Sequence, residues 1–520
     1  MSFDKDTTLY AVWSNVYYIT FDPNEGSGSM VKQKFTEGVE QNISPNLFTK
    51  TGDDFSGWSR QKLPKDSPHE YDNGAKIVLD STTGSITLYA VWVTGSRQLF
   101  VSDNGNDNNT GSSESPFKHL QAAITRITSA ASINDDWEVN IRGTVYGNTE
   151  IAAFKAKKLT IQKDGTDPAV LSGSSGTDSS SVLTVSDKSD IVIKDVSISG
   201  GSGTKGTDGI FYGGGIYLKH ADAKLTLETN SVITGNSAAR GAGIYVESGT
   251  LNLAGGEISS NTGATNGGGV YMSGGEFNLN SGTIKSHNAT NGGGVYVSGG
   301  TFNLNAGNIG VSGDGNGNTA TNGGGLYIAG GVVTMGDGTI SYNKASSSGG
   351  GVYIASQKFS MTGGCIENNL AAGAETTNGG GGIYNESEFI LKGASVIRNN
   401  KAKSSDDKKG KGGGVYNKGT FIMSGSALIG DSTESYPTGE ASGSNYASDI
   451  GGGIFNDSAA VKFEMKESAK IAHNYSKSYG GGLFNDVTDL NKVTYIVANI
   501  VYNNTKIDDT YAEAQIGGNK

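Results

Sequence analysis

The chain has 520 residues, of which 81 are glycine and only 7 are proline, and its formal net charge is −11. The low proline content excludes collagen, and the acidic balance argues against nucleic acid as a partner. The single cysteine, Cys365, excludes an internal disulfide. No run of about 18 apolar residues occurs, which argues against insertion of these residues into a membrane.

Residues 1–13 contain the string TTLYAVW, which recurs almost unchanged as ITLYAVW at residues 86–92. A repeated string of this kind indicates that residues 1–13 are the end of a preceding repeat. We therefore expect the chain to be part of a longer protein, which would carry the export signal that these first residues lack.

Residues 14–93 carry strand-like segments rich in β-branched and aromatic residues, separated by turn-forming residues. The strings ITFDPNEGSGS, LFTKTGDDFSGWS, YDNGAKIVL and LYAVW occur in an order that resembles one internalin B-type repeat of the Listeria–Bacteroides family. The resemblance implies a small β-grasp-like module, with Trp58 and Trp92 in its core, that serves as a spacer or weak ligand binder on cell-surface proteins. The sequence departs from the family at Asp53, where an aromatic residue is usual.

Residues 94–136 are predicted to form a linker and an N-terminal cap. Ser115 is a favourable N-cap residue, and Pro116 suits the first position of a helix. The apolar residues that follow have helical spacing: Phe117, Leu120, Ala123, Ile124 and Ile127. This stripe predicts a short amphipathic helix that covers the open end of the first coil.

The polar stretch before this helix holds three carboxylates that could ligate calcium: Asp103, Asp107 and Glu114. Their spacing is imperfect, because the glycine expected at the sixth position of a calcium loop is missing. The alternative is a solvated turn without a metal.

A repeat dominates the chain after about residue 205, and weaker apolar alternation from near residue 137 extends the predicted coils over residues 137–505. The string GGGIY at residues 213–217 occurs in ten versions, about 30 residues apart on average. Each version precedes an alternating segment, such as FNL at residues 277–279, and most coils then carry an Ile-x-x-Asn motif. Three short strands per turn with glycine corners predict a right-handed parallel β-helix. The chain is therefore predicted to be all-β, with residues 506–520 as a C-terminal tail.

Asparagine at a recurring corner predicts a ladder of side-chain hydrogen bonds from coil to coil. A second ladder is predicted at Asn385, Asn417, Asn456 and Asn485. Together with the glycine motif, as in ITGNSAARGAGIY, the pattern resembles the repeats of polymorphic outer membrane proteins. That resemblance implies a surface-exposed or secreted protein associated with adhesion and immune interaction.

The aromatic residue after each glycine run forms a column: Tyr271, Tyr296, Tyr327, Tyr353, Tyr384 and Tyr416, continued by Phe455 and Phe484. The apolar neighbours of each tyrosine, such as Val270 and Met272, favour an outward-facing column that could stack on sugar rings. The two phenylalanines favour burial as a structural aromatic stack instead. Both alternatives stay open at this point.

An enzymatic alternative, a β-helix polysaccharide lyase or glycoside hydrolase, requires carboxylates on neighbouring coils of one face. The outward slot between paired apolar residues holds no two adjacent acids: Thr226, Asn252, Asn278, Asn303, Thr334, Ser360, Ile390, Ile422 and Glu464. His287 and His473 are predicted to occupy the same repeat position, just before an asparagine, but they lie several coils apart, too far for joint chemistry. We therefore predict no catalytic residue and no cofactor.

Two insertions lengthen the C-terminal coils, at what the pattern indicates is one corner: residues 401–411 and 430–449. Longer loops on one face of a solenoid commonly carry recognition. The candidate ligand-binding residues are Asp431, Glu434, Tyr436, Glu440 and Asp449.

The chain is thus predicted to be a non-enzymatic, adhesin-like protein, extracellular or at the cell surface, whose solenoid presents a binding face to a host matrix protein or glycan. One alternative is the polysaccharide-cleaving enzyme, which predicts an acidic cluster in residues 430–449 beside a groove. The other is a purely structural stalk, which predicts a surface without a groove or patch.

Overall fold

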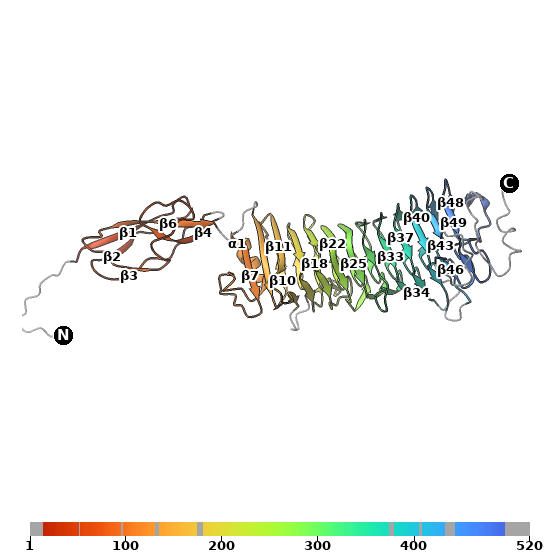
Figure 1. The fold of residues 1–520 in the computed structure, drawn as a ribbon, viewed down its shortest axis with the longest axis horizontal. Helices are drawn as coiled ribbons and strands as arrows, with labels where there is room; N and C mark the ends of the chain where they lie inside the picture. The colour runs from red at the N-terminus through yellow and green to blue at the C-terminus, as the bar shows by residue number, and fades with distance from the viewer. Residues whose placement is uncertain are drawn as a thin grey trace, which may run out of the picture. The chain divides into compact units, whose positions relative to one another are not determined.

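The computed structural model describes residues 14–50, 53–94, 97–130, 135–173, 180–373, 379–404, 408–431 and 443–494. The chain divides into two compact units, Met1–Gln98 with Ile127–Asp135, and Leu99–Arg126 with Asp136–Lys520. Figure 1 shows a small sheet in the first unit and a long stack of coils in the second. The predicted repeat end at residues 1–13 and the predicted tail at 506–520 lie outside the described residues.

The first unit is a mixed sheet in the order β2 (Gln33–Thr36), β1 (Val16–Asp22), β6 (Ile86–Thr94) and β4 (Asp53–Ser59). The central strands β1 and β6 run parallel, and each outer strand is antiparallel to its neighbour. A separate antiparallel pair consists of β3 (Gln41–Asn42) and β5 (Lys76–Ile77). Trp58 and Trp92 are 0% and 2% exposed within one apolar core, as the family resemblance implied.

The second unit is a stack of coils held together by three sheets of 12, 24 and 8 strands. Equivalent strands of successive coils pair in parallel, and the same residue types lie side by side, such as Tyr271 beside Tyr296 and Asn278 beside Asn303. The regular coiling begins with the strand that starts at Asp136. These pairings confirm an all-β chain with a parallel β-helix.

The strands of this unit follow the repeat. The 12-stranded sheet contains β10 (Thr149–Ile151), β13 (Leu183–Val185), β18 (Ile216–Leu218), β21 (Ile244–Val246), β24 (Val270–Met272), β27 (Val295–Val297), β31 (Leu326–Ile328), β35 (Val352–Ile354), β39 (Ile383–Asn385), β43 (Val415–Asn417), β47 (Ile454–Asn456) and β51 (Leu483–Asn485). The eight-stranded sheet contains β23 (Ala264–Asn266), β26 (Asn288–Asn291), β30 (Thr319–Asn322), β34 (Lys344–Ser348), β38 (Leu370–Ala371), β42 (Lys401–Ala402), β46 (Tyr446–Ala447) and β50 (Tyr475–Ser476).

The 24-stranded sheet has two columns, which are joined in the long strands β22 (Thr250–Ser259) and β25 (Glu276–Lys285). The first column also contains β8 (Asp136–Arg142), β11 (Lys158–Lys163), β14 (Asp190–Lys194), β19 (Lys224–Leu227), β28 (Thr301–Leu304), β32 (Val332–Met335), β36 (Lys358–Met361), β40 (Glu388–Leu391), β44 (Thr420–Met423), β48 (Lys462–Met465) and β52 (Val493–Thr494). The second contains β9 (Thr144–Tyr146), β12 (Val170–Ser172), β15 (Ser197–Ser199), β20 (Val232–Thr234), β29 (Asn308–Ile309), β33 (Thr339–Ser341), β37 (Cys365–Glu367), β41 (Val396–Arg398), β45 (Leu428–Gly430) and β49 (Lys470–Ala472). The remaining elements are β7 (Gln98–Ser102) in the same sheet, the hairpin of β16 (Thr204–Lys205) and β17 (Phe211–Tyr212), and the 3-10 turn η1 (Leu490–Lys492).

The central coils hold a strand that the sequence did not indicate. The three expected segments lie in the 12-stranded sheet and in the two columns of the 24-stranded sheet. The additional strand forms the eight-stranded sheet and follows the asparagine of the Ile-x-x-Asn motif directly, as β34 follows Asn343. It escaped notice because its short polar strings, such as NATN, lack the alternation of apolar residues that marks a strand.

Apolar side chains at alternate strand positions fill the interior of the coils. Phe277 and Leu279 are 0% exposed, whereas Asn278 between them is only half-buried. Phe302 of the next coil stacks on Phe277 with ring centroids 4.8 Å apart. This distance is the spacing between neighbouring strands, so equal side chains stack wherever the repeat keeps its register.

A ladder of buried side chains lines the corner that follows the isoleucine strand in successive coils. Asn343, for example, donates from Nδ2 to Ile309 O at 2.8 Å and to Asn369 Oδ1 at 3.0 Å. The ladder consists of Asn236, Asn261, His287, Asn318, Asn343, Asn369, Asn400, Asn445 and Asn474. The second predicted ladder is also confirmed, because successive amides from Asn385 to Asn485 are joined at 2.7 Å.

The glycine triplet is required by close approach of neighbouring coils. Gly349 has a φ of 67°, which is the left-handed region. A Cβ on Gly350 would lie 2.4 Å from Gly381 O, and a Cβ on Gly351 would lie 3.0 Å from the ladder amide of Asn369. Gly349 therefore provides the turn, and Gly350 and Gly351 leave room for the backbone and the ladder amide of the neighbouring coil.

The predicted cap is confirmed as a helix, α1 (Leu120–Ala130), but the predicted start at Ser115 and Pro116 is wrong. Phe117 forms a bridge with Val101 and so lies in an extended segment. The amides that precede α1 are bound by Asp107, whose Oδ1 accepts from the backbone N–H groups of residues 118 and 119 at 3.0 and 2.9 Å. A long-range carboxylate thus replaces the local N-cap.

The helix also supplies a hydrogen-bond acceptor to the strand at the end of the stack. Gln121 Oε1 on α1 accepts a hydrogen bond of 2.8 Å from the backbone N–H of Glu150 in β10. Because β10 is the terminal strand of the 12-stranded sheet, this amide has no further strand to pair with. The contact is that of a helix covering a sheet edge.

Exchange of Asp107 for alanine is expected to destabilise α1 by about 1–2 kcal/mol, because two amides and the ring of His119, 2.6 Å from Asp107 Oδ2, lose their acceptor. Hydrogen exchange of the α1 amides measures the effect. Asp222→Ala, at an exposed turn, is the control. Equal exchange in both variants would contradict the capping role.

Candidate functional site

The predicted tyrosine column faces away from the coil interior. The neighbours of each tyrosine in its strand are fully buried, as Val270 and Met272 are on either side of Tyr271. Side chains alternate along a strand, so the tyrosines lie on the outer face. Even there, Tyr271, Tyr384 and Tyr416 are only 3–6% exposed, and the three tyrosines between Tyr271 and Tyr384 are half-buried.

The rings cover one another. The stack from Tyr271 through Tyr296 and Tyr327 to Tyr353 has centroid distances of 4.9, 5.1 and 4.9 Å and interplanar angles of 14°, 5° and 9°. A sugar that stacks on an aromatic residue needs a free ring face, and these faces already contact neighbouring rings. The column therefore offers ring edges and hydroxyl groups.

Charged groups lie against the column at two places. The guanidinium carbon of Arg240 lies 5.6 Å from the ring centroid of Tyr271, and Lys418 Nζ lies 5.3 Å from that of Tyr384. The hydroxyl of Tyr353 donates to Glu386 at 2.8 Å. Burial and the neighbouring tyrosines raise the pKa of Tyr296 to about 12, so its hydroxyl stays a hydrogen-bond donor at physiological pH.

Of the candidate loop residues, Glu434, Tyr436 and Glu440 lie outside the described residues. Asp431 directly follows β45, and its backbone oxygen accepts a hydrogen bond of 2.8 Å from His473 Nδ1. Asp449 lies after β46, where its backbone pairs with Gly410 and Ser478. Of the two described candidates, Asp431 therefore lies where the insertion begins, and Asp449 lies after it in the coil.

The two insertions lie at different corners, in contrast to the prediction from the pattern. One of them separates Ile429 from the ladder residue Asn445, so it precedes the ladder, and residues 445–449 belong to the coil itself. The other follows β42 and leads to the glycine run at residue 412, so it comes after the ladder. Residues 310–317 form a third loop, placed like the first, between Ile309 and Asn318.

The calcium candidates do not converge. Asp107 is occupied as the cap of α1, and Glu114 is exposed. Asp103 lies near Gly143, where an added Cβ would be 2.9 Å from its carboxylate. Among the described residues, no group of three or more His, Cys, Asp or Glu side chains is placed to hold a metal ion.

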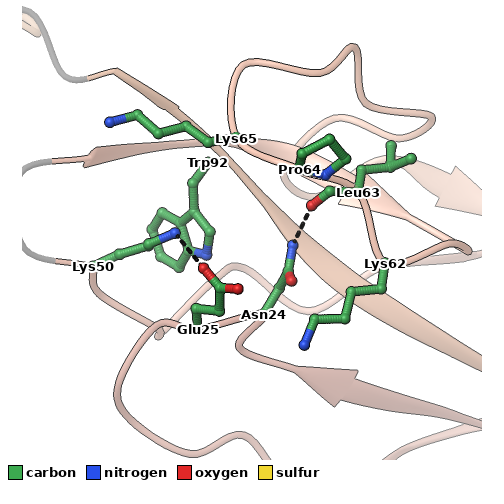
Figure 2. Close-up of a pocket in the computed structure, with 8 residues that line it drawn as sticks. All are labelled: Asn24, Glu25, Lys50, Lys62, Leu63, Pro64, Lys65 and Trp92. Atoms are coloured by element: carbon green, nitrogen blue, oxygen red, sulfur yellow. Dashed lines mark hydrogen bonds and ion pairs between the residues drawn. The ribbon is translucent and has the colours of Figure 1, made fainter.

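The first unit contains a pocket of about 270 Å³, shown in Figure 2. It is lined by four segments that are distant in the sequence: Asn24 and Glu25, Lys50, residues 62–65 (Lys62, Leu63, Pro64 and Lys65), and Trp92. The Asn24 amide is 5% exposed and donates to Leu63 O at 2.9 Å and to Ala90 O at 2.8 Å. These bonds tie the turn before the pocket to its opposite wall.

The pocket is rich in ammonium groups. Lys50 Nζ lies 3.3 Å from Glu25 Oε2 and 3.6 Å from Asp53 Oδ2, and Lys65 pairs with the other oxygen of Asp53. Lys62 is exposed and has no ion pair among the described residues. The Asp53 side chain is only 6% exposed, so it stays buried by pairing with two lysines where the family usually has an aromatic residue.

A second polar group in this unit resembles a nucleophilic triad in its connections. Ser56, at a bulge of β4, lies 2.9 Å from His69 Nδ1, and His69 Nε2 lies 2.8 Å from Asp72 Oδ1. Gly57 is required here, because a Cβ would lie 2.4 Å from the ring of His69. Asp72 is 86% exposed, so water screens its charge and weakens its electrostatic interaction with His69.

We therefore expect no labelling of Ser56 by a fluorophosphonate probe, which reacts with serines activated by a buried base. Mass spectrometry after incubation of the chain checks this, with an active serine hydrolase as the positive control. Labelling that disappears in Ser56→Ala would contradict it and favour a hydrolytic function.

Sequence reasoning missed both the lysine pocket and the Ser56–His69–Asp72 group. Their members come from separate turns and strands, and no period or motif joins them. The departure at Asp53 was the one available signal, because a carboxylate in a core position indicates a charged partner nearby.

Residues 17–91 match the family model of the Listeria-Bacteroides repeat domain, which covers the pocket except Trp92. No curated protein and no solved structure matches the chain. In the described part of the chain, no helix is long and apolar enough to cross a membrane. The matched repeat is typical of surface proteins, and this repeat together with a parallel β-helix fits a cell-surface protein.

Proposed function

We propose that the chain is a non-enzymatic, adhesin-like protein, extracellular or at the cell surface, whose solenoid is a stiff support for binding surfaces. The observation that carries the proposal is the continuous ladder from Asn236 to Asn474, in which each side chain is hydrogen-bonded to the next. Such a ladder resists bending between coils because each coil is fixed to its neighbours by buried bonds. The resemblance of the coils to polymorphic outer membrane protein repeats supports the same function.

The insertion between Ile429 and Asn445 is the proposed recognition segment for a glycan or a matrix protein. It interrupts the Ile-x-x-Asn motif, and it carries four of the five candidate residues. Loops of this kind can change without loss of the underlying coil, so they are suited to recognition. For the same reason, deletion of the loop is expected to leave the coil intact, so that a loss of binding can be assigned to the loop itself.

The test is a binding array of bacterial and host glycans and matrix proteins, probed with the chain and with a variant that lacks residues 431–443. The deletion leaves Ile429-Gly430-Ser444-Asn445, which restores the Ile-x-x-Asn spacing. Ser444 would then take the left-handed position before the ladder, as Ser260 and Ser286 do with φ of 54° and 61°. The matched control lacks residues 311–316 and restores the same spacing before Asn318.

Saturable binding that is lost in the 431–443 deletion and kept in the 311–316 deletion supports the proposal. Absence of binding by all three forms would overturn it in favour of a structural stalk. Shortening of a bound polysaccharide would overturn it in favour of the enzymatic alternative.

A further inference from the structure

The lysine pocket of Figure 2 has a feature that its fold does not require. Glu25 places its carboxylate 3.3 Å from Lys50, although its side chain is 70% exposed. Asn24 and Glu25 have φ of 44° and 72°, so two successive non-glycine residues adopt the left-handed conformation. Strain of this kind persists only where the surroundings hold it, and it is concentrated at binding sites.

Buried hydrogen bonds fix the backbone of the strained turn, whereas the carboxylate of Glu25 is held only weakly. The buried amide of Asn24 fixes the turn to Leu63 and Ala90, and Trp92 Nε1 donates to Pro23 O at 2.9 Å. By contrast, the pair between Glu25 and Lys50 lies at the surface, where water competes with it. Glu25 is therefore an anion that is paired with Lys50 at an exposed position and that another anion can replace.

We propose that this pocket binds an acidic sugar unit, one that bears a carboxylate or a sulfate group. The anionic group of the sugar takes the position of the Glu25 carboxylate at Lys50, and Lys62, which also lines the pocket, adds a second positive charge. The volume of about 270 Å³ lies at the small end for ligand pockets, which suits a single sugar ring. The site is separate from the solenoid insertion, so it holds whether or not the insertion binds a ligand.

A sugar fits the lining better than an acidic peptide. Peptides that bind in extended form add to an open sheet edge through their main chain. The strand at the pocket, β6, is already paired on both sides, with β1 and with β4. The hollow instead presents several separate lysine donors beside the largely buried indole of Trp92, and donors spaced in this way orient a compact polar ring.

Two substitutions with opposite expected effects test the proposal. Glu25→Gln removes the internal competitor and is expected to tighten binding of glucuronate by about two- to fivefold. Lys62→Gln removes a charge that the fold does not use and is expected to weaken it by a similar factor. Lys76→Gln is the matched control, because Lys76 is paired with Glu40 at 3.0 Å elsewhere in the same unit.

Titration of the full chain by calorimetry or nuclear magnetic resonance measures the dissociation constants for glucuronate, galactose 6-sulfate and glucose. The opposite shifts in the two variants, with either acidic sugar and without binding of glucose, support the proposal and identify the anionic group. Equal affinity in the parent chain, Glu25→Gln and Lys62→Gln overturns it. Binding of a glutamate dipeptide in preference to both acidic sugars also overturns it. Equal melting temperatures of all variants establish that the shifts do not come from unfolding.

Discussion

Exchange of Asn343 for alanine is expected to lower the free energy of unfolding by about 3–5 kcal/mol. The side chain is 1% exposed and takes part in four hydrogen bonds to neighbouring coils. Its Nδ2 donates to Ile309 O and to one ladder oxygen, and its Oδ1 accepts from the backbone and the side chain of Asn318. Alanine leaves these buried partners unsatisfied, at about 1–3 kcal/mol each when no water replaces the bond.

Urea unfolding followed by circular dichroism, together with hydrogen exchange of the coils on either side, measures the loss. The control is Asn303→Ala in the outer slot, where Nδ2 donates to Asn278 Oδ1 at 2.9 Å on a half-buried surface. Water can replace that bond, so we expect a loss below about 1 kcal/mol. Equal losses in the two variants would mean that the buried ladder contributes no more than the exposed one.

The repeat made the registers of the solenoid predictable. A stack of coils places equivalent residues side by side, so an alignment of the repeats is already a list of neighbours. The predicted outward slot from Thr226 to Glu464 forms in full, and no two adjacent residues in it are acidic. Even the two alternatives for the tyrosines proved compatible, because an outward column of stacked rings is also largely covered.

The errors came from positions where the motif itself is altered. His287 and His473 both precede an asparagine, yet only His287 is a ladder residue, three positions after Ile284. In the coil of His473 the ladder residue is Asn474, three positions after Ile471. Counting from the apolar residue of the preceding strand gives the correct assignment, because that residue is fixed by the core.

The first unit was less predictable because it has no stack of equivalent coils that could reveal its contacts. Its pocket combines Glu25, Lys50 and Lys62 from separate segments that no sequence pattern brings together. The start of α1 was missed for a related reason. The local signal at Ser115 was favourable, but Asp107 binds the amides and Phe117 pairs with Val101.

The second large effect is a dependence of the stability on pH, and it arises from the histidine that replaces asparagine in the ladder. His287 is 2% exposed and lies between two amides whose roles determine its protonation. Asn261 Nδ2 donates to His287 Nε2 at 3.2 Å, so Nε2 carries no proton, and Nδ1 donates to Asn318 Oδ1 at 2.9 Å. The ladder therefore requires a neutral ring. Burial lowers the pKa of His287 to about 4, although its bond to Asn318 and the charge of Glu257 act in the opposite direction.

Because the pKa is about 4 in the folded chain and 6.5 in the unfolded one, the unfolded chain binds more protons between these values. Above pH 6.5 the ring is neutral in both states and does not lower the free energy of unfolding. On acidification to pH 4, protonation of His287 in the unfolded chain lowers the free energy of unfolding by about 3 kcal/mol. His287→Asn restores the ordinary ladder residue and is expected to remove this part of the pH dependence, with little change at pH 7. Urea unfolding at pH 7 and pH 4.5 measures it, with His220→Asn at a turn as the control. A parent chain and a His287→Asn variant that lose equal stability on acidification would show that His287 is free to take up a proton in the folded ladder.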